Sequence, residues 1–270
     1  MRIRTILLTM VGAMIIAGTS WAGAIKVNGS TTVLPIGQAA AEAFMKENPN
    51  ISVSISGGGS GNGIKAIVDG STDIAMSSRF IKDKEIAMAV EKNRYPVPFA
   101  VAYDCIVPVV HPSNPVSNLT LDQLKGLYMG TVKNWKEVGG PDKQVVVISR
   151  DTSSGTYEVW EEKVMKKERV FAGALLQASN GAVAQAVAKN PFAIGYVGYG
   201  YLNKDLKALT VNSVVGSPDT TLDGTFPISR ALFMFTNGWP EGDAAKFINF
   251  VLNPNKGQKL VKEQGFVPLF

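Results

Sequence analysis

The sequence predicts an α/β fold of two lobes, each a mainly parallel sheet flanked by helices, with two strands that cross between the lobes. Short apolar runs alternate with helical patterns along most of the 270 residues, which is typical of parallel sheets covered by helices. Two longer apolar stretches, "PFAVAYDCIVPVV" at 98–110 and "FPISRALFMFTN" at 226–237, are the candidates for the crossing strands. A chain of this length can form one large domain or two ordinary ones of roughly 100 to 200 residues.

The first residues have the pattern of a secretory signal peptide. Arg2 and Arg4 precede the apolar stretch "TILLTMVGAMIIAG", and small residues follow it. This predicts a signal peptide over 1–24, cleaved after Ala22 or Ala24. A membrane anchor is disfavoured because the apolar stretch is shorter than the ~20 residues that span a bilayer. No cysteine follows the cleavage region, so we expect no lipid anchor and a mature protein in the periplasm.

The first lobe is expected to comprise residues 25–102 and 230–270. Its strands are predicted from short apolar runs, and helix formers with helical spacing follow each strand. Pro35 suits the first turn of its helix, where a backbone N–H would have no partner in any case. The predicted strands are 25–29, 51–56 and 73–78, and the predicted helices are 35–47, 64–70, 82–90, 242–253 and 257–265.

The second lobe is expected to comprise residues 103–229. "TLDQ" at 120–123 has the spacing of a capping box and begins a helix. "QVVVIS" at 144–149 is a β-branched run short enough for a buried strand, and a helix is predicted after it at 157–167. "AIGYVGYG" at 193–200 is predicted to be another strand.

The composition excludes several classes of protein. The 27 basic and 22 acidic side chains give only a mild excess, which does not suit a nucleic-acid binder with a concentrated basic face. The single cysteine, Cys105, lies in an apolar run and is predicted to be a buried, inert thiol. Clustered cysteines and histidines are missing, so we expect no metal site and no cofactor. Ile64 stands where a P-loop needs lysine, which disfavours a nucleotide site.

The segment "RDTSSGT" at 150–156 is rich in hydrogen-bond donors and lies between a predicted strand and a predicted helix. A helix start carries unpaired N–H groups and the positive end of the dipole, so it suits a small anion. Arg150 adds a forked, permanently charged donor, and Ser153, Ser154 and Thr156 add hydroxyls. The alternative is that Ser154 only caps the helix and Arg150 is a solvated surface charge. A serine hydrolase is disfavoured because nothing places the single histidine, His111, beside Ser154.

Three further predicted strands also lead into turns made largely of Ser, Thr, Gly or Arg. "NGSTTV" at 28–33 and "GGGSGNG" at 57–63 each follow a strand and open a helix, and "SSR" at 77–79 ends a third strand. In open α/β sheets, ligands bind beyond the carboxyl ends of the strands. These turns can therefore converge on one crevice that binds an anion.

The motifs taken together, in this order, resemble the periplasmic phosphate-binding proteins of ABC-type phosphate importers. The resemblance covers nearly the whole mature chain and rests on "GSTTV", "GGGSGNGI", "DIAMSSR", "LKGLYMGTVKNWKEVGG", "RDTSSGT", "AIGYVGYGY", "FPISRALF" and "GQKLVKEQGFVPL". It implies a two-lobed periplasmic-binding-protein fold of the type II kind. It also implies a monomer without catalytic activity, which closes on inorganic phosphate and delivers it to a membrane permease.

The resemblance also implies the residues that bind the ligand. The turn after the first strand, the start of the second helix and the "RDTSSGT" segment match the family's phosphate-binding motifs. One form of the family has an aspartate where Ser78 stands, so the oxyanion could instead be sulfate, molybdate or tungstate; a secreted phosphohydrolase is the alternative of another class. The expected binding residues are Ser30, Thr31, Thr32, Ser60, Ser78, Arg79, Arg150, Ser153, Ser154, Gly155 and Thr156.

Overall fold

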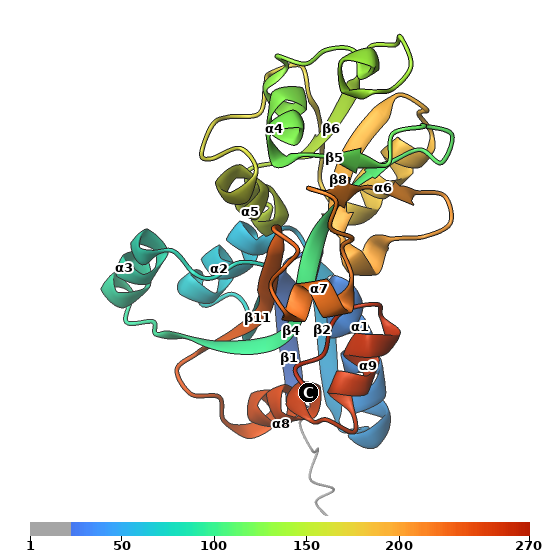
Figure 1. The fold of residues 1–270 in the computed structure, drawn as a ribbon. Helices are drawn as coiled ribbons and strands as arrows, with labels where there is room; N and C mark the ends of the chain where they lie inside the picture. Colours follow the sequence, from blue (N-terminus) through green and yellow to red (C-terminus); the bar gives the residue numbers. More distant parts are fainter. Residues whose placement is uncertain (1–22) are drawn as a thin grey trace, which may run out of the picture.

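The computed structural model describes residues 23–270, which form two α/β lobes placed one above the other (Figure 1). The strands lie in the order β2-β1-β3-β11-β4-β8-β6-β7, and β9 pairs with β4. Their bounds are β1 Gly23–Gly29, β2 Ile51–Gly57, β3 Ile74–Ser77, β4 Pro96–Val110, β6 Val146–Arg150, β7 Leu175–Gln177, β8 Ala193–Gly198, β9 Lys207–Ala208 and β11 Ser229–Asn237. A separate parallel pair joins β5 (Asn118–Leu119) to β10 (Thr210–Val211).

The first lobe contains β1, β2 and β3, which are parallel to one another, and β11, which is antiparallel to β3. Its helices are α1 (Leu34–Glu47), α2 (Ser60–Asp69), α3 (Asp83–Glu91), α8 (Gly242–Leu252) and α9 (Gly257–Glu263). The ring of Phe44 in α1 meets the rings of Phe247 and Phe250 in α8 edge to face, at centroid distances of 5.3 and 5.6 Å. Burial of these aromatic rings ties the last helices of the chain to the first one.

The second lobe contains β6, β7 and β8, with β8 antiparallel to the end of β4. Its helices are α4 (Leu121–Met129), α5 (Gly155–Lys163), α6 (Asn180–Ala188) and the short α7 (Pro218–Leu222), with 3-10 turns at Trp135–Val138 and Tyr199–Tyr201. The core includes Trp160, which stacks on Tyr196 at 4.3 Å, and Tyr128 tilted against both rings. This second core is separate from the one under α1 and α8.

The strand β4 joins the two lobes. It pairs with β11 as far as Cys105 and changes its partner to β8 from Ile106 onward. Figure 1 shows β4 running from the first lobe into the second, beside the start of β11. The predicted crossing strands are therefore present. The lobe boundaries near residues 102 and 230 stay predictions. The change of strand partner after Cys105 supports the first of them.

Most of the predicted elements are found near their expected positions. Thr120 and Gln123 form the predicted capping box of α4. The helix expected at 64–70 begins earlier, at Ser60, because Gly59 takes a positive φ of 101° and turns the chain into the helix there. The helix expected to reach residue 167 ends at Lys163.

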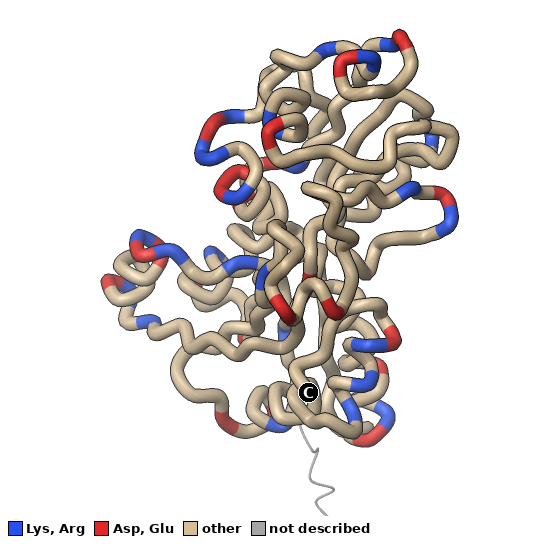
Figure 2. Tube along the Cα trace, in the orientation of Figure 1, with Lys and Arg blue, Asp and Glu red and all other residues tan. Residues whose placement is uncertain are grey.

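The predicted signal peptide over 1–24 lies almost entirely outside the described residues, whose first two, Gly23 and Ala24, belong to β1. Within residues 23–270, none of the helices combines the length and apolar character needed to cross a membrane. Figure 2 shows charged residues distributed mainly around the outer edges of both lobes, without one large basic face in this view.

Candidate anion-binding site

The polar turns predicted from the sequence meet where the two lobes touch. The end of β1, the start of α2 and the end of β3 come from the first lobe, and the turn between β6 and α5 comes from the second. The polar side chains gathered there are almost completely buried: Ser30, Thr31, Thr32, Ser60, Ser78, Arg150, Ser154, Thr156 and Asn180. Buried polar groups are costly unless they are paired, so this group needs a specific explanation.

Gly155 brings the two lobes into direct contact. A Cβ atom at this position would lie 2.3 Å from Ser60 Oγ and 2.7 Å from Ser78 Oγ, so a larger residue would force the lobes apart. Nearby, the backbone N–H of Gly61 donates to the carbonyl oxygen of Ser153 at 2.9 Å. The predicted binding segments 57–63 and 150–156 therefore lie face to face across the boundary between the lobes.

Several hydroxyl oxygens at the site already accept hydrogen bonds from backbone N–H groups. Ser154 caps α5 and accepts from Tyr157 N at 3.2 Å, and Ser60 Oγ accepts from Ser78 N at 3.0 Å. Ser30 Oγ accepts from Thr32 N at 3.1 Å. A hydroxyl whose oxygen accepts from the protein keeps its own hydrogen for another partner. Ser154 can therefore cap the helix and also donate to an anion, so the two roles that the sequence presents as alternatives do not exclude each other.

Arg150 is buried with only part of its guanidinium satisfied. Its Nε and Nη2 donate to the carbonyl oxygens of Gln177 and Ala178, both at 3.0 Å, whereas Nη1 has no hydrogen-bond partner among the described residues. Burial lowers the pKa of Arg150, and the nearby charge of Arg230 acts in the same direction. The alternative of a solvated surface charge is wrong, because this side chain is 1% exposed.

The structure adds to this polar group three residues that were not predicted as ligands: Asp104, Asn180 and Arg230. Arg230 at the start of β11 donates to Asp104 Oδ2 from Nε at 3.1 Å and from Nη2 at 2.8 Å. Its Nη1 donates to Thr156 Oγ1 at 3.1 Å. Asn180 at the start of α6 donates to Thr32 Oγ1 at 3.0 Å. Arg230 lies inside the motif "FPISRALF", but nothing local in that motif indicates that the arginine faces the site.

The comparisons with known proteins agree with this arrangement. A model of the PBP superfamily domain matches residues 17–255. The phosphate-binding protein PstS of Staphylococcus saprophyticus is 36% identical to the chain over 261 residues, which cover 92% of this chain and 81% of the relative. The PstS of Borreliella burgdorferi is 32% identical, over 90% of this chain and 89% of the relative. The chain belongs to the PstS family of phosphate-binding proteins.

Solved structures of PstS-like proteins share the fold. A putative phosphate ABC transporter substrate-binding protein from Clostridium perfringens, solved with bound phosphate, has a TM-score of 0.86 and 32% identity, covering 92% of this chain and all of that one. An ABC-type phosphate transport receptor from Vibrio cholerae has a TM-score of 0.74 and 32% identity, covering 90% of this chain and 99% of that one. The two-lobed α/β architecture predicted from the sequence is confirmed.

Among the residues expected to bind the anion, Arg79 has the surroundings that differ most from those of a ligand. Its Nη1 and Nη2 donate to the two carboxylate oxygens of Glu85 at 2.8 and 2.7 Å, and its Nε lies 2.5 Å from Glu158 Oε2 in α5. Lys82 Nζ also lies 2.6 Å from Glu158 Oε2. Burial acts to raise the pKa of Glu85, but Arg79 and Lys82 outweigh this effect and lower it. Arg79 is thus neutralised by two carboxylates and joins the lobes.

Ser153 also makes contacts that were not expected. Its hydroxyl and its backbone N–H both donate to Asp151 Oδ1, and the hydroxyl reaches Gly58 O at 3.4 Å. These contacts link the two lobes, and none of them involves the hydroxyls of Thr32 and Thr156. We assign Ser153 and Arg79 to the boundary between the lobes, and we keep the other predicted residues as candidate ligands.

The single cysteine and histidine lie apart from these contacts. Cys105 is completely buried, as predicted, and burial raises the pKa of its thiol to about 12, so the thiol stays protonated. His111 Nδ1 interacts with Ser113 Oγ at 2.7 Å in the loop after β4. Within residues 23–270, no group of three histidine, cysteine or acidic side chains is placed to hold a metal ion.

Proposed function

We propose that this chain binds inorganic phosphate between its two lobes and delivers it to the membrane permease of an ABC importer. One observation carries the proposal: Arg150, which begins the donor-rich turn between β6 and α5, buries a guanidinium nitrogen that has no partner within residues 23–270. A buried cation without an opposite charge is unfavourable, and a bound oxyanion supplies that charge. The relatives named phosphate-binding proteins support phosphate as the anion.

The candidate ligands suit a small dianion. Ser30, Ser154 and Thr156 each keep an O–H group for a ligand, and hydrogen bonds to charged groups contribute about 1.5–3 kcal/mol each. Gly155 permits the close approach of the lobes that such a small ligand requires. The affinity we expect is micromolar or better, which corresponds to about −8 kcal/mol.

We also propose that the chain is a binding protein without catalytic turnover, which acts as a monomer outside the cytoplasm after its signal peptide is removed. The support for a role outside the cytoplasm is the "TILLTMVGAMIIAG" stretch behind two arginines and the family's role in ABC transport. Sulfate, molybdate or tungstate would be the ligand instead if Ser78 fails to favour a protonated anion.

Calorimetric titration tests the proposal directly. The mature protein, freed of phosphate by extensive dialysis, is titrated with phosphate, sulfate and molybdate. Phosphate binding at micromolar concentration or tighter is the expected result. Tighter binding of sulfate or molybdate would move the assignment to another oxyanion, and the absence of binding to all three would overturn it.

A further inference from the structure

The orientation of the Asn180 side chain is set by the protein. The backbone N–H of Gly198 lies 3.2 Å from Asn180 Oδ1, and a backbone N–H can only donate. The amide nitrogen Nδ2 must then point the other way, where it donates to Thr31 Oγ1 at 3.2 Å and to Thr32 Oγ1 at 3.0 Å. Both threonine oxygens are therefore acceptors of this amide.

Arg230 acts on the same group of hydroxyls. It donates to Thr32 Oγ1 from Nη2 at 3.3 Å and to Thr156 Oγ1 from Nη1 at 3.1 Å. A guanidinium has only donors, so both oxygens must accept. Asp104 is completely buried and also accepts from Tyr199 N at 2.8 Å. Arg230 cannot turn away without leaving this carboxylate buried and without its cation, which is costly.

These contacts leave one direction for the hydrogens of the two threonines. Thr32 Oγ1 accepts from Asn180 and Arg230, so its single hydrogen is left to donate, and Thr156 Oγ1 lies 2.9 Å away. Thr156 Oγ1 then accepts from Thr32 and Arg230, and its own hydrogen is free for a ligand. Gly198 N–H thus donates to Asn180, Asn180 to Thr32, and Thr32 to Thr156, so the last hydrogen in this order is that of Thr156.

We propose that Asn180 and Arg230 are positioning residues that make the Thr32–Thr156 corner of the anion site donor-only. An unprotonated oxygen of the anion binds against Thr156, because a P–OH group cannot donate there and its oxygen is a weaker acceptor than a charged one. The hydroxyl of a protonated phosphate must turn to an oxygen that can still accept, such as Ser78 Oγ. This inference rests on the proposed function, because it takes the anion to lie against Thr156.

Asn180→Asp reverses the chain of donors. An aspartate still accepts from the Gly198 N–H, but its other oxygen accepts from Thr32 O–H, which lets Thr156 donate to Thr32 and present a lone pair to the ligand. Phosphate and sulfate are titrated at mildly alkaline pH, where both are dianions and the added charge repels them equally. Sulfate affinity is expected to fall about tenfold more than phosphate affinity, because only phosphate can donate to the reversed oxygen.

Arg230→Lys is the second variant, and it keeps a positive charge beside Asp104. A lysine donates from a single nitrogen and lacks the fork by which Arg230 reaches Asp104 and both threonines, so the order of the hydrogens is relaxed. The ratio of phosphate to sulfate affinity is expected to rise about threefold. Arg150→Lys is the control, since it removes the forked donor without touching either threonine, and it should weaken both ligands equally.

The outcomes distinguish a failure of the donor-only corner from a failure of the proposed function. Equal losses for both ligands in Asn180→Asp and Arg230→Lys, or a shift in favour of sulfate, would overturn the donor-only corner. A wild-type protein that binds neither ligand overturns the proposed function before any variant is compared. Thermal melting shows whether each variant folds, and Arg230→Lys carries the test if Asn180→Asp does not fold.

Discussion

Arg150 uses two of its nitrogens to hold the carbonyl oxygens of Gln177 and Ala178, and it buries the third with no partner in the part of the chain that the structure describes. Arg150→Lys is expected to weaken phosphate binding by about 10- to 100-fold, because a single ammonium nitrogen replaces the fork that spreads its donors over three nitrogens. Calorimetry of the two proteins measures this difference. An unchanged dissociation constant would remove Arg150 from the site.

Ser78 is the residue expected to set selectivity. Its hydroxyl lies 3.2 Å from Ser60 Oγ, and a neutral hydroxyl can either accept from a phosphate hydroxyl or donate to sulfate. We therefore predict that the unmodified protein prefers phosphate over sulfate by at most about 100-fold. Ser78→Asp should widen this preference, because a carboxylate accepts from protonated phosphate and repels sulfate. Ser78→Asn is the uncharged control, and competition titration gives the ratio.

Exclusion of sulfate by several thousandfold in the unmodified protein would contradict the role of Ser78. Three acids close to these motifs in the sequence, Asp73, Asp104 and Asp151, could replace Ser78 as the acceptor, but each already accepts hydrogen bonds from the protein. Asp73 accepts from Lys26 N at 2.8 Å, Asp151 accepts from Ser153 N at 2.9 Å, and Asp104 accepts from Arg230 and Tyr199 N. Asp104, which is completely buried and paired with Arg230, is the least available of the three to a ligand.

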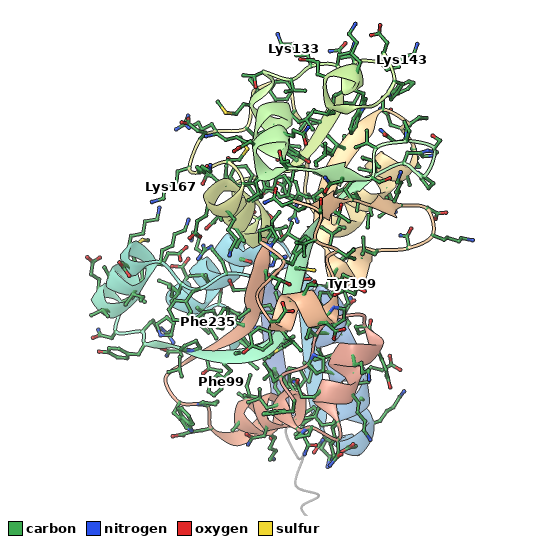
Figure 3. The ribbon with its side chains drawn as sticks, in the orientation of Figure 1. Phe99, Lys133, Lys143, Lys167, Tyr199 and Phe235 are labelled. Carbon is green, nitrogen blue, oxygen red and sulfur yellow. The ribbon has the colours of Figure 1, made fainter. Side chains whose placement is uncertain are left out.

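At the scale of elements, α3 and α5 face each other across an opening of about 720 Å³ between the lobes. Lys167 lies on the second-lobe side of this opening (Figure 3). Glu158 in α5 binds Arg79 and Lys82 of the first lobe, and its side chain is only 12% exposed. This three-residue contact stabilises the arrangement in which the lobes touch, because partial burial strengthens an ion pair that would contribute little on an open surface.

Glu158→Gln is expected to weaken phosphate binding by about three- to tenfold and to make the affinity less sensitive to salt. The variant removes the charge that joins the lobes without changing the size of the side chain. Glu162→Gln is the matched control, because Glu162 lies on the same helix and lines the same opening but has no ion pair in the described structure. Equal behaviour of the two variants in titrations over a range of salt concentrations would show that the contact does not support binding.

The elements that the sequence predicted well are those whose signals are local. The strand ends predicted at 29, 78 and 149 lie within one residue of the observed ends at 29, 77 and 150, and the capping box of α4 is where it was predicted. The helix α6 was not predicted, because "NGAVAQAVA" consists mostly of small apolar residues without a polar face. The roles of Arg79, Arg230 and Asn180 were missed for another reason. Their partners are distant in the chain, and only the contact between the lobes brings them together.

At the scale of the whole molecule, the two lobes are joined by β4 and the start of β11, and their other contacts surround the candidate site. Thr32 of the first lobe meets Thr156 of the second, and the Tyr201 hydroxyl donates to the carbonyl oxygen of Thr31. Two bodies connected by a few strands can rotate about that connection, as hinge-closing binding proteins do. We therefore expect the lobes to separate when no anion is bound.

Solution X-ray scattering with and without phosphate measures whether the lobes close on the anion. We predict that the radius of gyration of the dialysed protein falls when saturating phosphate is added. The same titration of Arg150→Ala should show no compaction at phosphate concentrations that saturate the unmodified protein. A radius of gyration that stays the same when calorimetry shows phosphate to be bound would contradict the account, because the anion would then bind without closing the lobes.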